Sequence, residues 1–211
     1  MKIILFILGY LVVSVNAVAD TLEVEYASFY SHVKKLDDPE TNALRFTFGF
    51  QHIAHKRLCH ISSGQITTQK QTLPLIVENN SRFTVPTDKI LKMAKAKVVI
   101  ELDDQANQCD MSVQLETLPS FLKIQYSHDE LLLLFNQYQA FFDEMGGFLS
   151  FMMPLPQGLV LQFDNATAPL KEGKILLDEN GNVRLSEDWL ILGKGLELTT
   201  PPLRITAIIE N

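Results

Sequence analysis

The sequence predicts a β-rich α+β protein made of two similarly wired units, each with a strand and a helix at its start and antiparallel hairpins after them. Three observations lead to this prediction. Short runs of alternating apolar and polar residues lie between turns rich in Asn, Gly and Pro. Two segments show the periodicity and the end signals of helices. Local motifs recur at a spacing of about 100 positions along the chain.

The first unit is predicted to contain one helix and a series of strands. The helix covers residues 27–36 and stops ahead of Pro39. The first long strand covers residues 44–53, where phenylalanines alternate on one face. The turn Asn79-Asn80-Ser81 is expected to join two strands in a hairpin. The other strands are expected over residues 58–68, 72–78, 82–85, 98–102 and 108–117.

The second unit is predicted to repeat this order. A strand over residues 122–126 precedes Ser127-His128-Asp129-Glu130, a capping box in which Ser and Glu satisfy free backbone N–H groups. The helix that starts there runs to about Met145, where Gly146 can adopt the left-handed C-terminal conformation. The turn Asn180-Gly181 is a strong hairpin signal. The strands are expected over residues 158–163, 174–177, 183–185 and 203–209.

The matching order of the two halves indicates an internal duplication. Val24-Glu25-Tyr26 recurs as Ile124-Gln125-Tyr126, Glu78-Asn79-Asn80 as Glu179-Asn180-Gly181, and Phe83, Val85 and Asp88 as Val183, Leu185 and Asp188. Chance recurrence of strand and turn residues in a β-rich chain is the alternative. The expected division is a signal peptide over residues 1–19, a β-rich unit with a disulfide over 20–118 and an α+β unit over 119–211.

Composition and charge exclude several classes of protein. The chain has 211 residues, of which 46% are hydrophobic, so it is neither disordered nor collagen-like. Its net charge of −7 argues against nucleic-acid binding, which needs a surplus of Lys and Arg.

The first residues resemble an export signal. Lys2 precedes an apolar run from Ile3 to Val13, and Ala17-Val18-Ala19 fits a cleavage site. The alternative is a tilted membrane anchor, but the run is short for the roughly 30 Å of a bilayer core. No transmembrane segment is expected in the mature chain.

Cys59 and Cys109 are the two cysteines of the chain. In an exported protein an even number favours a disulfide. Cys109 shares strand parity with Met111, and Cys59 shares it with Ile61, so both thiols are expected to face inward. A redox-active pair is the alternative, but that function usually uses a C-x-x-C motif, which does not occur in the sequence.

Four features occur together in the sequence: Phe29-Tyr30-Ser31-His32-Val33-Lys34-Lys35-Leu36, the cysteine pair, Met145-Gly146-Gly147 and Pro201-Pro202-Leu203-Arg204-Ile205. Together they resemble a family of exported gammaproteobacterial proteins that is known only as a domain of unknown function. The resemblance covers nearly all of the chain after the signal. It implies a periplasmic location, and it offers no catalytic residues.

Local motifs give little support for metal or cofactor chemistry. One ligand-like cluster contains His52, His55, Cys59 and His60. Strand geometry separates the histidines, and exposed strand-end histidines are the favoured interpretation.

A second motif begins like a calcium loop, with Asp178, Asn180 and Asn182. The Gly and the bidentate acid that such a loop requires are replaced by Val183 and Trp189. A hairpin turn explains them. No cofactor and no metal site is predicted.

Two segments are candidates for contact with partners. The first is a basic stretch of four lysines, Lys89, Lys92, Lys95 and Lys97, which could meet anionic lipid or polysaccharide phosphates. A solvated face is the simpler interpretation of this stretch.

The second is the segment over residues 148–156, which is apolar and contains two prolines. They line the junction of the units, or they are exposed and contact an envelope protein or lipid. Phe151, Met152 and Leu155 are the proposed binding residues of that segment.

The sequence therefore predicts a soluble, exported, periplasmic accessory protein that binds a partner without catalysis. No G-x-S-x-G, P-loop or dinucleotide-binding pattern occurs. The alternative is an envelope-acting hydrolase whose site is assembled in space from distant residues.

Overall fold

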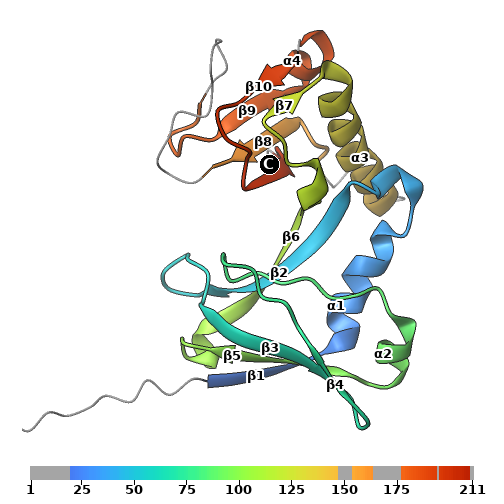
Figure 1. Cartoon of the computed structure of the whole chain (residues 1–211), viewed down its shortest axis with the longest axis vertical. Helices are drawn as coiled ribbons and strands as arrows, with labels where there is room; N and C mark the ends of the chain where they lie inside the picture. Colours follow the sequence, from blue (N-terminus) through green and yellow to red (C-terminus); the bar gives the residue numbers. More distant parts are fainter. Residues whose placement is uncertain (1–19, 147–153, 164–176, 194, 210–211) are drawn as a thin grey trace, which may run out of the picture.

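A computed structural model describes residues 20–146, 154–163, 177–193 and 195–209. Within these residues the chain forms helices and several antiparallel sheets, which confirms the predicted β-rich α+β class (Figure 1). The helices are α1 (Tyr26–Val33), α2 (Lys89–Met93), α3 (His128–Gly146) and α4 (Glu187–Leu192), with the short 3-10 helices η1 (Lys34–Leu36), η2 (Pro39–Thr41), η3 (Ala106–Gln108) and η4 (Pro119–Phe121).

The first unit is built on a four-stranded sheet and a two-stranded ribbon. The sheet has the order β1-β5-β3-β4, and the ribbon pairs β2 with β6. In Figure 1 the ribbon runs from this sheet toward the second unit. The strands are β1 (Asp20–Glu25), β2 (Leu44–His52), β3 (Ile61–Thr67), β4 (Thr72–Pro74), β5 (Lys97–Leu102) and β6 (Cys109–Thr117).

The second unit has a three-stranded sheet of order β11-β8-β9 and a short pair of β7 with β10. Helix α3 lies along one side of these strands (Figure 1). The strands are β7 (Gln125–Tyr126), β8 (Gly158–Gln162), β9 (Val183–Ser186), β10 (Leu196–Glu197) and β11 (Arg204–Ala207).

Buried apolar side chains from both units form one hydrophobic core. The rings of Phe46 on β2 and Phe141 on α3 meet edge to face, with centroids 5.6 Å apart. Tyr138 on α3 is fully buried, and its hydroxyl lies 3.2 Å from that of Thr117 on β6 in the first unit. The core therefore continues across the expected unit boundary near residue 118.

The described strand pairings occur in the same order in both units. β1 pairs with β5, and the backbone N–H of Tyr26 donates to Ala96; β7 pairs with β10, and Tyr126 lies opposite Leu196. The ribbon β2–β6 corresponds to the pair β8–β11. This is the wiring that a duplication predicts. Residues 164–176, which would correspond to β3 and β4, lie outside the described residues, and the duplication itself stays a prediction.

The two hairpin turns match in their backbone hydrogen bonds. The N–H of Ser81 donates to Glu78 (2.9 Å), and the N–H of Gly181 donates to Asp178 (3.0 Å). Ser81 and Gly181 both have positive φ angles, 57° and 77°. The Asp178 carboxylate accepts hydrogen bonds from the backbone of Asn180 and Asn182, so the calcium-like residues form a hairpin turn as predicted.

Candidate functional site

Helix α3 begins at the predicted capping box. The backbone N–H of Ser127 donates to Glu130 Oε2 (2.9 Å), and the backbone N–H of Glu130 donates to Ser127 Oγ (3.2 Å). Lys123 Nζ donates to Glu130 Oε1 at 2.6 Å. These contacts, that of Lys123 first, lower the pKa of Glu130 to about 2. The capping box is therefore confirmed, and it fixes the start of the helix that carries the candidate site.

The outer side of α3 is partly apolar. Its inner side packs into the core through Leu131, Leu134, Phe135, Tyr138 and Phe141. The outer side carries two leucines, Leu132 and Leu133, and Leu133 is 47% exposed. Leu132 is partly buried against the core, so Leu133 supplies the exposed apolar surface on this side of the described helix.

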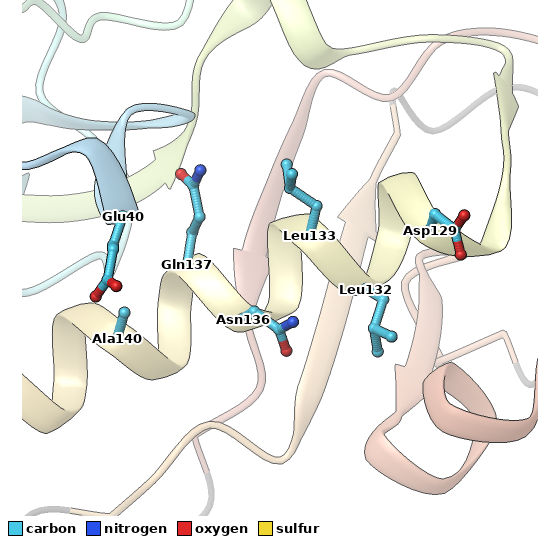
Figure 2. Close-up of a pocket in the computed structure, with 7 residues that line it drawn as sticks. All are labelled: Glu40, Asp129, Leu132, Leu133, Asn136, Gln137 and Ala140. Atoms are coloured by element: carbon cyan, nitrogen blue, oxygen red, sulfur yellow. The ribbon is translucent and has the colours of Figure 1, made fainter.

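A cavity of about 440 Å³ runs along this outer side (Figure 2). Figure 2 shows Asp129, Leu132, Leu133 and Asn136 along α3, with Glu40 of η2 beside Ala140. Gln137 anchors η2 to the helix, because its Oε1 accepts a hydrogen bond from the backbone N–H of Ala43 (2.6 Å) and its Nε2 donates to Asn42 (2.8 Å). The buried side-chain amide of Gln137 thus fixes η2, which carries Glu40, beside α3.

A second cavity of about 280 Å³ continues the first toward β7. Both cavities are lined by Asp129 and Leu133. Phe121 of η4 forms the far wall, and Tyr126 fixes it by donating a hydrogen bond to the Phe121 carbonyl (3.1 Å). Burial raises the pKa of Tyr126 to about 12. We call the two cavities together the α3 groove; it is lined by Glu40, Phe121, Lys123, Tyr126, Asp129, Glu130, Leu132, Leu133, Leu134, Asn136, Gln137 and Ala140.

The charges of the α3 groove are mainly negative. Glu40, Asp129 and Glu130 supply three carboxylates, and Lys123 supplies one ammonium group, which is already paired with Glu130. The side chain of Asp129 is almost fully exposed. An apolar floor with an acidic rim favours ligands that combine apolar and cationic groups.

The predicted partner-binding residues are only partly described. Phe151 and Met152 lie outside the described residues, and Leu155 is 50% exposed. Binding through residues 148–156 stays a prediction. The exposure of Leu155 agrees with the exposed alternative at that one position.

The predicted disulfide is present between Cys59 and Cys109, and both residues are buried. The parity argument for it holds for Ile61, which is buried, but not for Met111, which is 42% exposed. Alternation still separates two faces at this end of the β2–β6 ribbon, where Cys109 is buried and Asp110 is exposed, and Met111 departs from it.

The histidine cluster is divided among different partners. Cys59 is used in the disulfide, and His60 Nδ1 lies 2.6 Å from Asp103 Oδ2 on the surface. His52 is buried, and its Nδ1 accepts a hydrogen bond from the backbone N–H of Ala54 (3.2 Å). Among the described residues, no group of three or more His, Cys, Asp or Glu side chains is arranged to hold a metal ion.

A charged cluster that the sequence did not predict lies where the ribbon meets β11. Arg45 pairs with Glu78 (2.7 Å) and Glu116 (2.6 Å), and Arg204 Nε lies 3.7 Å from Glu116 Oε2. Arg82 Nε and Nη1 are buried without a hydrogen-bond partner in the described part of the chain. Burial, and then the nearby Arg204, lower the pKa of Arg82. Strand alternation places Arg45 and Glu116 on one side of the ribbon, but the cover over that side comes from distant segments.

The sequence matches a family described as "Protein of unknown function (DUF2987)" over residues 18–163. No curated protein and no solved structure matches it significantly. The matched residues include all those that line the α3 groove. No helix in the described ranges is long and apolar enough to cross a membrane.

Proposed function

We propose that this chain, which belongs to the DUF2987 family, is an exported, periplasmic accessory protein that acts by binding a partner without catalysis, and that the α3 groove is its binding site. The observation that supports this proposal most is the outer side of α3, where exposed Leu133 joins two cavities with an acidic rim. Export and the periplasmic location rest on the first nineteen residues and on the family resemblance.

The length of the α3 groove suits a peptide segment. From Asp129 to Ala140 the helix rises by roughly 17 Å at about 1.5 Å per residue. An extended segment of about five residues spans that length at about 3.3 Å per residue. Its apolar side chains would cover Leu132, Leu133 and Phe121, and a Lys or Arg would face Asp129. The proposed ligand is therefore a basic, apolar segment of another protein.

The hydrolase alternative has one observation in its favour, the close pair of His60 and Asp103. Both side chains are more than half exposed, and neither lines the α3 groove. Catalytic acid–base pairs usually lie in a cleft that excludes water. Binding is thus the better supported function.

The α3 groove can be tested with short synthetic peptides that differ only in charge. One peptide alternates Leu with Lys, and a matched peptide alternates Leu with Glu. We expect the basic peptide to shift the amide resonances of α3 in ¹⁵N–¹H spectra, and the acidic peptide to leave them unchanged. Equal shifts with both peptides, or shifts confined to other elements, would contradict the proposal.

Leu133→Ser is the informative variant, because it removes the exposed apolar side chain that both cavities share. Ile191→Ser is its matched control, since Ile191 is similarly exposed on α4, away from the α3 groove. We expect Leu133→Ser to weaken binding of the basic peptide about tenfold, from the loss of roughly 1.5 kcal/mol of apolar contact. Ile191→Ser should leave the affinity unchanged.

A further inference from the structure

Helix α2 exposes an apolar pair at its surface. Ile90 and Met93 are each 73% exposed, while Leu91 between them is buried and fixes the helix to the core. Asp88 caps the helix by accepting a hydrogen bond from the backbone N–H of Ile90 (2.6 Å). Residues three positions apart lie on one side of a helix. The two apolar side chains therefore project together from a well-anchored turn.

Lysines surround this pair. Lys89, Lys92 and Lys95 are exposed, and none of them forms an ion pair with a described residue. Lys97, the fourth lysine of the stretch, is paired with Glu23 at 2.7 Å and does not belong to the group. Lys92 Nζ lies 5.3 Å from the centre of the Tyr30 ring on α1. We define the α2 patch as Lys89, Ile90, Lys92, Met93 and Lys95.

Helix α4 provides a natural comparison, because it occupies the corresponding place in the second unit. It also exposes two apolar side chains, Ile191 and Leu192. Its own six residues contain two acids, Glu187 and Asp188, and no lysine. Within the residues of the two helices themselves, lysines accompany the exposed apolar side chains of α2, and acids accompany those of α4.

We propose that the α2 patch docks the protein on an anionic lipid surface. In a protein with a net charge of −7, a local group of lysines with no acidic partner among the described residues is complementary to lipid phosphates. Long lysine side chains keep their ammonium groups at headgroup level while apolar neighbours reach the edge of the acyl region. Ile90 and Met93 have the exposure that such insertion requires. The α2 patch is separate from the α3 groove, and the lipid-docking proposal does not depend on peptide binding in that groove.

The test uses the mature chain, which starts at Asp20 after the predicted cleavage, and sedimentation with vesicles. Phosphatidylcholine vesicles are compared with vesicles that also contain phosphatidylglycerol. We expect binding only to the anionic vesicles, and weaker binding at high salt. Binding that is equal for both vesicle types would overturn the proposal.

Two pairs of variants separate the α2 patch from general effects. K89Q/K95Q should weaken binding about thirtyfold, because each lysine contributes about fivefold near an anionic surface. K56Q/K70Q removes the same charge elsewhere and should have little effect. I90S/M93S should weaken binding about tenfold, whereas I191S/L192S should not. Equal losses in the two members of either pair would overturn the proposal.

Insertion can be followed directly at position 93. Trp189 is the single tryptophan of the chain, so M93W in a W189F background places one fluorophore in the α2 patch. We expect its emission to shift to the blue and to be quenched by lipids with brominated acyl chains, in anionic vesicles only. Unchanged emission in protein that sediments with the vesicles would show that another surface binds. An unchanged thermal midpoint of each variant shows that folding is intact.

Discussion

Asp104 stabilises the loop that leads to Cys59. Its carboxylate accepts hydrogen bonds from the guanidinium of Arg57 and from the backbone N–H of His60 (3.0 Å). These contacts, that of Arg57 first, lower the pKa of Asp104 from 3.8 to about 2. Because the pKa in the folded state lies below that in the unfolded state, the stabilisation is present above about pH 4. It is lost as the pH falls from about 4 to about 2.

We therefore expect Asp104→Asn to remove part of the acid sensitivity of the protein. The thermal midpoint of the variant should be lower than that of the original chain at neutral pH, and the two midpoints should converge toward pH ~2. Differential scanning calorimetry across the acid range measures this. Asp143→Asn on the exposed side of α3 is the control and should leave the pH profile unchanged. Parallel profiles for Asp104→Asn and the original chain would contradict the assignment.

The residues of the α3 groove were only partly predictable. The run Leu131 to Phe135 is apolar at every position, which indicated a helix with more apolar surface than one core face needs. Which leucine stays exposed depends on how α3 is rotated against the sheets, and that is fixed by packing of distant residues. Glu40 and Phe121 reach the α3 groove from η2 and η4, and no spacing in the sequence connects them with α3.

The capping box at the start of α3 contributes measurably to the free energy of unfolding. Ser127→Ala leaves the backbone N–H of Glu130 without its side-chain partner. We expect the free energy of unfolding to fall by about 1 kcal/mol, measured by urea denaturation. Ser28→Ala is the matched control: Ser28 is exposed within α1, where alanine is the better helix former, so that variant should be as stable or slightly more stable. Equal losses in both variants would argue against the cap.

The disulfide links the start of β6 to the segment that follows β2. Cys59 and Cys109 are separated by 50 positions. In the chain-entropy account, a loop of this length stabilises the folded state by about 4 kcal/mol. We expect denatured, non-reduced protein to contain no titratable thiol, and reduction to lower the free energy of unfolding by about that amount. Two thiols in the non-reduced protein would contradict the prediction.

Most long elements were predicted within a few residues, and the short ones were not. The expected helix over 128–145 and the strands over 44–53 and 108–117 correspond to α3, β2 and β6. Helix α4 and strand β10 were missed, because elements this short show hardly one period of any pattern. Thr72–Pro74 pairs with β3 and not with residues 82–85, because Thr68 closes a tight turn with Gln71. That turn has no Gly, Asn or Pro to reveal it.

At the scale of the whole molecule, the corresponding pairings support the duplication more strongly than the sequence motifs do. A recurring turn sequence fixes only a local conformation. Pairing β1–β5 and β7–β10 in the same register requires that two segments distant in the chain meet in the same way twice. The bridges Val77–Phe83 and Leu177–Val183 repeat this agreement. Helix α3 has 19 residues and α1 has 8, so β8 begins farther along the chain from β7 than β2 begins from β1.

Buried hydrogen bonds and ion pairs join residues of the first unit to residues of the second. Tyr138 of α3 donates to Ile205 of β11, and its hydroxyl lies 3.2 Å from that of Thr117 on β6. Arg204 of β11 donates to Gln114 of β6 (2.8 Å) and faces the buried carboxylate of Glu116. Because buried apolar and polar groups are shared in this way, we expect both units to unfold in one cooperative transition.

Glu116→Gln tests that coupling, because it removes a buried charge that Arg45 of the first unit and Arg204 of the second both approach. The substitution leaves the partly buried Arg45 with Glu78 alone and takes the nearby carboxylate from Arg204, which should lower the free energy of unfolding by about 2 kcal/mol. Fluorescence of Trp189 reports on the second unit, and hydrogen exchange in β5 reports on the first. We expect both probes to move by the same amount, while the exposed control Glu179→Gln moves neither. A change confined to β5 would show that the units unfold separately, and that the shared core does not couple them.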